Sequence, residues 1–301
     1  MKILLLGKNG QLGWELQRTL SVLGELVALD RSGQQTLCGD LSNLDSLRET
    51  IAALKPDIIV NAAAYTAVDQ AETETGLALL INHQAPQVLA QEALKTRALL
   101  VHYSTDYVFN GSGNKPWHEN DMTEPLNLYG KSKLAGEQAI QNSGCQHLIF
   151  RTSWVYGSKG NNFAKTMLRL ASERQVLSVI NDQIGAPTSA ALLADCTAHA
   201  IHQTIHNKQL CGLYHLAASG QTSWYEYACL VIEHSRSIGQ KLLVNKINPI
   251  NTLHYPTPAK RPHNSRLNTT KFCKNFDLVL PEWRNGVIRM LNETIKNQEI
   301  I

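Results

Sequence analysis

The chain of 301 residues contains no long hydrophobic run. Its longest apolar stretches, such as Ile3–Leu6 and Ile58–Val60, fall far short of the ~20 residues that a helix needs to cross a bilayer. The first residues also differ from a signal peptide, because one basic and four apolar residues lead straight into Gly7 without a cleavage site. We therefore expect a cytoplasmic protein that does not associate with membranes.

Paired cysteine motifs are also missing. None of the six cysteines is spaced as Cys-x-x-Cys, and none stands beside a histidine at ligand spacing. This excludes the usual zinc and redox motifs and predicts reduced thiols, as in cytoplasmic proteins. The small net charge of +3 and the lack of a basic stripe argue against nucleic-acid binding.

Apolar residues make up 43% of the chain, enough for a sizeable core. Short apolar runs alternate with helical periodicities through the first half. The expected strands are Lys2–Leu6, Glu25–Asp30, a run just before Gly39, Asp57–Ala62, Ala98–Ser104 and His147–Thr152. This alternation predicts an α/β fold with a Rossmann-type, doubly wound parallel sheet covered on both faces.

The pattern loosens after Gly157, although helices are still expected near 161–172, 189–205, 224–237 and 283–296. We predict a dinucleotide-binding domain over residues 1–157, to which segments of about 185–218 return. Residues 158–184 and 219–301 are expected to form mainly a smaller α/β lobe that binds substrate.

A glycine motif joins the first strand to the first helix. Gly7, Gly10 and Gly13 are spaced as G-x-x-G-x-x-G. Glycine permits a tight turn and a close backbone approach to a pyrophosphate, and the helix N-terminus offers unpaired N–H groups. In this strand–turn–helix context the motif predicts dinucleotide binding.

Residues after the next strands indicate the adenosine side of this site. Asp30 ends the second strand and favours NAD, because a carboxylate there accepts hydrogen bonds from the ribose. Arg31 follows and favours NADP, because a guanidinium pairs with a 2′-phosphate. NADH and NADPH both remain open. Asp40 is expected near the adenine, and the small residues Ala62–Ala64 leave room for the cofactor.

Three residues predict carbonyl chemistry. Tyr129 and Lys133 are four apart and share one helix face, and Thr105 ends a strand 24 residues before Tyr129. A tyrosine with a pKa near ~10 exchanges protons poorly at neutral pH, and a nearby ammonium lowers that pKa. The hydroxyl of Thr105 can complete the hydrogen-bonding shell of a carbonyl oxygen.

Together these motifs resemble the extended short-chain dehydrogenase/reductases. Further blocks resemble the dTDP-4-dehydrorhamnose reductase family, so that the resemblance covers residues 1 to about 290. These blocks are Asn61–Asp69, Ser104–Phe109, Arg151–Gly157, Asn181–Thr188 and Arg261–Ser265.

The resemblance implies reduction of the 4-keto group of dTDP-4-dehydro-L-rhamnose by NADPH or NADH. This is the last step of dTDP-L-rhamnose synthesis, which serves cell-surface polysaccharides such as lipopolysaccharide O-antigen. It also implies that Tyr129 donates the proton, Lys133 binds the nicotinamide ribose and Thr105 binds the keto oxygen. The residues implied to hold the cofactor are Gly7, Gly10, Gln11, Leu12, Gly13, Asp30, Arg31, Asp40, Leu41, Ala62, Ala63 and Ala64. Those implied to hold the substrate are Thr105, Asp106, Trp154, Arg261, Asn264 and Ser265.

Some members of this family bind Mg²⁺ between subunits through acidic residues. Glu15 and Glu293 match two such positions, but the stretch 188–192 has no carboxylate for a third. Since Mg²⁺ prefers several hard oxygen ligands, a metal-bridged homodimer is in doubt, and the expected partner is a sugar nucleotide.

Two alternatives remain open: a reductase or epimerase of another nucleotide 4-keto-6-deoxy sugar, and a regulatory subunit without catalysis. A 4,6-dehydratase is disfavoured, because such enzymes carry Asp-Glu after the strand-end hydroxyl and this chain has Asp106-Tyr107.

Overall fold

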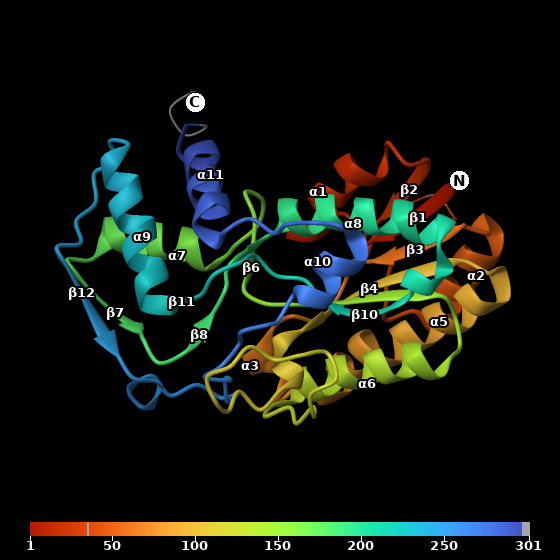
Figure 1. The fold of residues 1–301 in the computed structure, drawn as a ribbon, viewed down its shortest axis with the longest axis horizontal. Coiled ribbons are helices and arrows are strands. Elements are labelled where there is room, and N and C mark those ends of the chain that lie inside the picture. The colour runs from red at the N-terminus through yellow and green to blue at the C-terminus, as the bar shows by residue number, and fades with distance from the viewer. Residues whose placement is uncertain (35, 297–301) are drawn as a thin grey trace.

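The computed structural model describes residues 1–34 and 36–296, and within them a six-stranded sheet has the order β10-β5-β4-β3-β1-β2 (Figure 1). All five neighbouring pairs are parallel. The strands are β1 (Lys2–Leu6), β2 (Glu25–Leu29), β3 (Ile58–Asn61), β4 (Leu99–Thr105), β5 (His147–Thr152) and β10 (Gly212–His215). The predicted doubly wound parallel sheet is confirmed.

Helices cover both faces of this sheet, as Figure 1 shows. On one face lie α1 (Gln11–Leu20), α8 (Ala190–His206) and α10 (Thr270–Phe276). On the other lie α2 (Leu44–Leu54), α5 (Ala85–Thr96) and α6 (Leu128–Asn142). A cover on both faces explains why the strands read as continuous apolar runs rather than as an alternation of apolar and polar residues.

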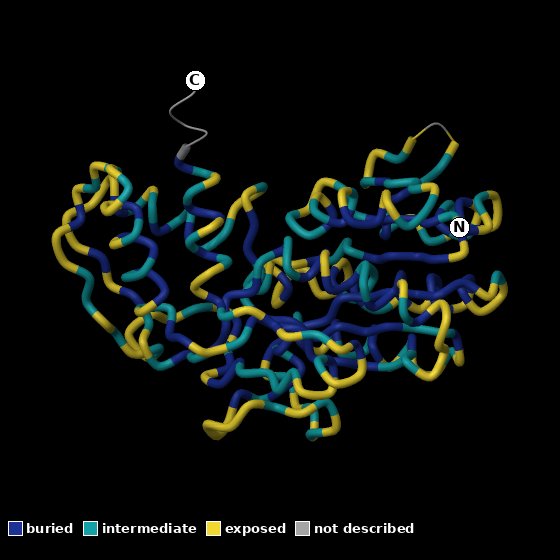
Figure 2. Tube along the Cα trace, turned by 45° about the horizontal axis from the view of Figure 1, so that its top comes forward, coloured by how far each residue is buried: buried dark blue, intermediate teal, exposed yellow. Residues whose placement is uncertain are grey.

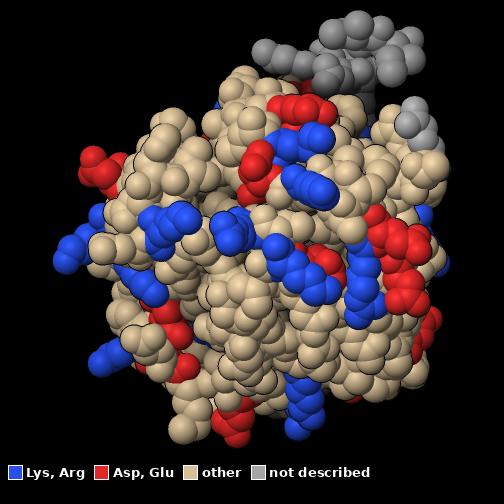
Figure 3. Space-filling view, turned by 90° about the vertical axis from the view of Figure 1, so that its right-hand side faces the viewer, with Lys and Arg blue, Asp and Glu red and all other residues tan. Residues whose placement is uncertain are grey.

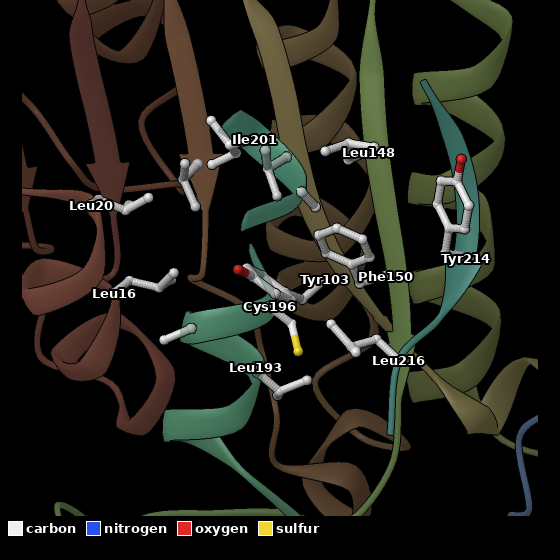
Figure 4. Close-up of a cluster of buried hydrophobic side chains, with 14 of the residues drawn as sticks. Leu16, Leu20, Tyr103, Leu148, Phe150, Leu193, Cys196, Ile201, Tyr214 and Leu216 are labelled. Atoms are coloured by element: carbon white, nitrogen blue, oxygen red, sulfur yellow. The ribbon is translucent and has the colours of Figure 1, made fainter. Parts of the chain in front are cut away.

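Successive residues of β1 supply two separate cores. Ile3 and Leu5 pack toward α1 and α8, whereas Leu4 and Leu6 pack toward α2 and α5, and all four side chains are fully buried. This follows from the two-residue period of a strand. Figure 4 shows the first core, in which Leu16 of α1, Leu193 of α8 and Phe150 of β5 belong to one cluster. In Figure 2 the central strands are the most continuously buried part of the chain.

The chain order reverses between β1 and β3, which are neighbours in the sheet. On one side the chain moves outward to β2, and on the other it moves through β4 and β5 to β10. Crossovers therefore leave the sheet in opposite directions at this point, and a crevice opens at the carboxyl ends of the strands. Gly7 follows β1 directly at this crevice.

The strand expected just before Gly39 was a wrong prediction. The described residues there form only an isolated antiparallel bridge between Gln34 and Leu37. Gly39 then passes so close to the Asp30 carbonyl that a Cβ would collide with it. The segment is therefore a tight turn against the end of β2 rather than a further strand.

A second group of elements lies beyond the carboxyl ends of the sheet, at the left of Figure 1. It consists of α7 (Phe163–Glu173), β7 (Val176–Ile180), α9 (Trp224–Ser237), β12 (Lys246–Ile250) and α11 (Trp283–Lys296), and β7 pairs with β12 in parallel. These elements enclose their own apolar core, which includes Tyr227, Val231 and Trp283. Ser223 and Glu226 form a capping box that starts α9.

The remaining elements are short. The helical ones are α3 (Val68–Ala71), α4 (Thr75–Leu79), a π-helical turn (Leu80–Gln84) and 3₁₀ turns at Asp106–Val108, Lys208–Leu210 and Thr252–His254. The extended ones are β6 (Val155–Tyr156) with β9 (Thr188–Ser189), and β8 (Ile184–Gly185) with β11 (Thr222–Ser223).

Among the described helices, none is both long and apolar enough to cross a membrane. Basic and acidic side chains are interspersed on the face in Figure 3, which lies at the amino ends of the strands.

Candidate active site

The glycine turn fits the backbone requirements read from its sequence. Gly7 has a φ of +88°, and a Cβ on it would lie 2.8 Å from the Ala63 nitrogen. A Cβ on Gly13 would collide with the Gly7 carbonyl, and the Gly10 N–H donates to that carbonyl at 3.0 Å. Neither Gly7 nor Gly13 therefore has room for a side chain. The turn brings the N-terminus of α1 to the end of β3.

The first turn of α1 has no side chain of its own as a cap, since its N-cap residue is Gly10. Leu12 packs against the core below the helix. Gln11 instead turns toward α7, where its Oε1 accepts a hydrogen bond from Asn162 at 3.2 Å. The N–H groups of this first helical turn therefore point toward the crevice as donors for an anion.

Acidic and basic groups meet where the adenosine end is predicted. Asp30 accepts hydrogen bonds from Asn9 at 2.6 Å and from the Ser32 N–H at 3.0 Å. Arg31 is mostly exposed, and its Nε lies 3.5 Å from an oxygen of Asp40. Burial alone would raise the pKa of Asp40, but hydrogen bonds from Ser42 and the charge of Arg31 outweigh it and lower that pKa.

Small residues at the end of β3 form the floor beside the glycine turn. The Ala62 N–H donates to the Leu6 carbonyl at 3.0 Å, and Ala63 abuts Gly7. Ala64 continues this segment, and Leu41 is buried in the core cluster that Ala63 contacts. The structure thus brings the predicted cofactor residues to one edge of the sheet.

Tyr129 lies in the first turn of α6, directly beside the end of β4. The side chain of Asn127 caps this helix by accepting from the Gly130 N–H at 2.8 Å. Gly130 has no room for a Cβ because it touches the Tyr107 carbonyl. This contact fixes Tyr129 against the turn that follows Thr105, and the Thr105 hydroxyl is close enough to lower the pKa of the Tyr129 phenol.

Burial shifts both members of the Tyr–Lys pair away from their charged forms. It raises the pKa of Tyr129 to about 12, although the Thr105 hydroxyl acts in the opposite direction. It lowers the pKa of Lys133 to about 8, against the opposing charge of Glu137. Tyr129 is therefore protonated at neutral pH and available as a proton donor, and Lys133 titrates close to the working range.

Asp106 is 2% exposed, and its Oδ2 has no hydrogen-bond partner among the described residues. Its Oδ1 accepts from the Thr105 hydroxyl at 3.2 Å. Burial raises its pKa to about 7, although hydrogen bonds from Ser265 and Thr105 oppose this shift. An orphaned oxygen in this position is suited to accept a hydrogen bond from a ligand hydroxyl.

The raised pKa of Asp106 makes a testable prediction for stability. The folded chain holds the proton between the ordinary pKa of 3.8 and about 7, whereas the unfolded chain releases it. The free energy of unfolding should therefore decrease as pH rises through this window, at a rate approaching about 1.4 kcal/mol per pH unit. Urea unfolding of Asp106→Asn and the parent chain, compared from pH 4 to pH 8, measures this. We expect the variant to gain relative stability with pH, and a constant difference would contradict the assignment.

Trp154 has a left-handed backbone, with a φ of +49°. Its ring stacks on that of Trp224 at 3.6 Å, and Gly185 leaves the space that it occupies. An uncommon backbone conformation held by such packing is typical of a functional site. Trp154 thus joins the end of the central sheet to α9.

Arg261, Asn264 and Ser265, which are predicted to bind the substrate, differ in how far their side chains are already engaged within the chain. Arg261 forms an ion pair with Asp69 at 2.7 Å and is partly exposed. Ser265 is buried beside Asp106. Asn264 is 1% exposed, and its amide bonds to Ser112, Lys115 and Arg266 within the chain. Its side chain holds the loop after β4 in place, and its role toward a ligand stays a prediction.

Glu15 and Glu293 lie around a hollow of about 300 Å³ between α1, α8 and α11. Both carboxylates face arginines: Glu15 lies 3.7 Å from Arg18, and Glu293 lies 3.0 Å from Arg289. No group of three or more potential metal-ligating side chains occurs among the described residues. Within one chain these residues therefore do not fit a magnesium site.

Two buried polar features of the site escaped the sequence analysis. His102 of β4 lies 3.2 Å from the Lys133 amine, and Arg151 of β5 pairs with Glu137 of α6 at 2.6 Å. A single histidine within the apolar run of β4 was the available signal, since buried polar side chains need partners.

Comparisons with known proteins agree with this geometry. The family model described as the RmlD substrate binding domain matches residues 1–296. The chain is 60% identical to dTDP-4-dehydrorhamnose reductase of Escherichia coli K12, over 97% of this chain and 98% of that protein. It is 59% identical to the Salmonella typhimurium enzyme of the same name, with the same coverage.

A solved structure supports the same relationship. The dTDP-4-dehydrorhamnose reductase of Bacillus anthracis, in complex with NADP, superposes with a TM-score of 0.86 and 36% identity. The match covers 97% of this chain and 99% of that one. The chain therefore belongs to the RmlD family of dTDP-4-dehydrorhamnose reductases.

Proposed function

We propose that this chain reduces the 4-keto group of dTDP-4-dehydro-L-rhamnose to give dTDP-L-rhamnose, with NADPH or NADH as hydride donor. The observation that carries the proposal is the convergence of Thr105, at the carboxyl end of β4, with Tyr129 and Lys133 of α6, at the edge of the sheet where the glycine turn follows β1. We further propose that residues 1–157 and about 185–218 bind the cofactor, and that the remaining segments form the substrate lobe.

The proposed reaction divides the work between the chain's side chains. The N-terminus of α1 and Ala62–Ala64 hold the dinucleotide, which supplies the hydride when bound. The Thr105 hydroxyl orients the keto oxygen, and Tyr129 gives that oxygen its proton, so that the C=O bond becomes C–OH. Lys133, one helical turn from Tyr129, would hold the nicotinamide ribose and, in its charged form, favour the phenolate that this transfer leaves on Tyr129. Asp106 and Trp154 orient the sugar ring.

Oxidation of NAD(P)H, followed at 340 nm with enzymatically generated dTDP-4-dehydro-L-rhamnose, tests the function directly. We expect oxidation that depends on the sugar nucleotide and yields dTDP-L-rhamnose. Cofactor binding without oxidation would instead indicate another 4-keto sugar nucleotide or a regulatory subunit.

Arg31 is expected to favour NADPH over NADH. It is largely exposed next to Asp30, and its weak contact with Asp40 leaves most of its donors free for a 2′-phosphate. We expect Arg31→Ala to raise KM for NADPH about tenfold and to change KM for NADH much less, because a hydrogen bond to a charged group contributes about 1.5 kcal/mol. Arg48→Ala is the matched control, since Arg48 also forms a surface pair, with Asp45. Equal losses with both cofactors would reject the phosphate contact.

The proposal includes a homodimer that needs no metal. Arg18 bridges Glu15 and Asp195, and Arg289 pairs with Glu293, so one face carries alternating charges that suit a second copy. We expect sedimentation velocity to give a dimer, unchanged by EDTA, that Arg18→Asp dissociates and Arg48→Asp does not. A dimer lost in EDTA would restore the magnesium interpretation.

The six cysteines are all free thiols, which fits the cytoplasmic location that we propose.

A further inference from the structure

A row of buried polar side chains leads from β3 through β4 to α6, the helix that carries Tyr129 and Lys133. Asn61 of β3 stands opposite His102 of β4 in the sheet register, and both are 1% exposed. The Asn61 Nδ2 lies 3.2 Å from the His102 Nδ1, and the His102 Nε2 lies 3.2 Å from the Lys133 Nζ. Lys133 is itself 2% exposed and donates to the Tyr103 carbonyl at 2.6 Å.

The backbone fixes the direction of the first bond in this row. The Ala63 N–H donates to the Asn61 Oδ1 at 3.2 Å. A backbone N–H can only donate, so the amide oxygen must face Ala63 and the amide nitrogen must face His102. The amide nitrogen in turn can only donate. The His102 Nδ1 is therefore the acceptor and carries no proton.

The neutral imidazole then has a single available tautomer. With Nδ1 unprotonated, the proton resides on Nε2, which faces Lys133. An N–H that faces an ammonium pairs a donor with a donor. The amine of Lys133 satisfies both neighbours only when it is neutral, with its lone pair toward Nε2–H and one N–H toward the Tyr103 carbonyl. A proton on Lys133 costs one of these bonds.

We propose that Asn61 and His102 are positioning residues that fix the orientation of Lys133 and set the pH at which its amine loses the proton. The unbroken row of hydrogen bonds, from the donating Ala63 N–H to the accepting Tyr103 carbonyl, carries this inference. The row makes the protonated Lys133 a stronger acid than burial alone would. Its catalytic meaning rests on the proposed reduction, in which Lys133 supports the proton transfer from Tyr129.

The other charged groups around Lys133 do not offset the effect of this row. Glu137, one turn along α6, favours the ammonium, but Arg151 neutralises it through a bidentate pair. Tyr129 is uncharged at neutral pH, because its pKa is about 12. Burial, and then the charge of Lys133, lower the pKa of His102 well below its usual range, so the ring is neutral as the row requires.

The histidine tautomer is directly measurable in the unmodified protein. A ¹⁵N–¹H correlation spectrum of histidine-labelled protein distinguishes a protonated Nε2 from a protonated Nδ1. The His102 signals are assigned by their loss in His102→Gln or His102→Leu. We expect a proton on Nε2 and none on Nδ1 at pH 7. A proton on Nδ1 would overturn the proposal. This measurement needs no substrate, so a failed reductase assay would leave its outcome intact.

Asn61→Asp reverses the direction of the hydrogen bonds through His102 and keeps the shape of the side chain at position 61. The carboxylate accepts from Nδ1–H, so Nε2 becomes an acceptor that suits the ammonium. We expect the titration midpoint of Lys133, followed by NMR with [ε-¹³C]lysine, to rise by at least about one pH unit. The alkaline limb of the kcat/KM profile for sugar-nucleotide reduction should move by the same amount.

The double variant separates the tautomer from the added charge. If the tautomer carries the effect, Asn61→Asp should shift the Lys133 midpoint much less in the His102→Leu background. An equal shift in both backgrounds would attribute the whole effect to the charge and overturn the role of His102.

Discussion

Tyr129→Phe is expected to lower the turnover of dTDP-4-dehydro-L-rhamnose by at least ~100-fold, because it removes the proton donor. The ring is retained, so its edge-to-face contact with Tyr107, at 5.7 Å between centroids, is preserved. Cofactor binding should change little, since the glycine turn lies on other elements. Steady-state rates and fluorescence titration with NADPH measure the two effects separately.

Tyr107→Phe is the matched control for this substitution. Tyr107 lies next to Tyr129, and burial raises the pKa of its phenol in the same direction, but it is outside the Tyr–Lys pair. We expect this variant to retain most of the turnover. A comparable loss in both variants would mean that packing rather than proton donation explains the result. Near-normal turnover of Tyr129→Phe would remove Tyr129 from the mechanism.

Arg151→Leu is expected to lower the free energy of unfolding by about 3–5 kcal/mol, because it leaves the Glu137 carboxylate buried without its partner. Glu137 is fully buried, and Arg151, at 4% exposure, binds it through both Nε and Nη2. The substitution also removes the guanidinium from the face of Phe109. Urea unfolding followed by circular dichroism measures the loss.

Two variants separate the buried pair from ordinary surface charge. Arg151→Leu combined with Glu137→Leu should recover most of the stability, because neither charge is then left unpaired. Arg169→Leu breaks an exposed pair with Glu173 and should cost no more than about 0.5 kcal/mol. If Arg151→Leu also lowered the free energy of unfolding by no more than about 0.5 kcal/mol, the Glu137 carboxyl group would have to be protonated or solvated.

The sequence predicted the sheet well because its central strands β1, β3, β4 and β5 are buried on both faces, whereas the edge strand β2 is only partly buried. Residues such as Leu4 and Leu5 pack into different cores, so the whole strand is apolar and stands out from the helical periodicity around it. A strand was also expected just before Gly39, where the described residues form a turn. The structure of this segment depends on the contact of Gly39 with the Asp30 carbonyl. That contact in turn depends on the path by which the chain returns to the end of β2.

The Tyr129–Lys133 pair could be predicted from the sequence because its two residues are close together in the chain. Tyr129 and Lys133 are one helical turn apart, so their spacing alone places them on one face. Asn61, His102 and Lys133 come from β3, β4 and α6, and their meeting depends on the pairing register of two strands. No local pattern encodes that register. The engagement of Asn264 with the loop after β4 is non-local in the same way.

The stack of Trp154 on Trp224 also has an optical consequence. Two indole rings 3.6 Å apart and nearly parallel share their electronic excitation, so their circular dichroism departs from the sum of two separate tryptophans. Trp154 follows β5 and Trp224 begins α9, and both pack against the core of the second group of elements. Any ligand that tilts the segment after β5 against α9 alters this signal. The protein thus carries a built-in reporter of how this segment lies on α9, readable without an attached dye.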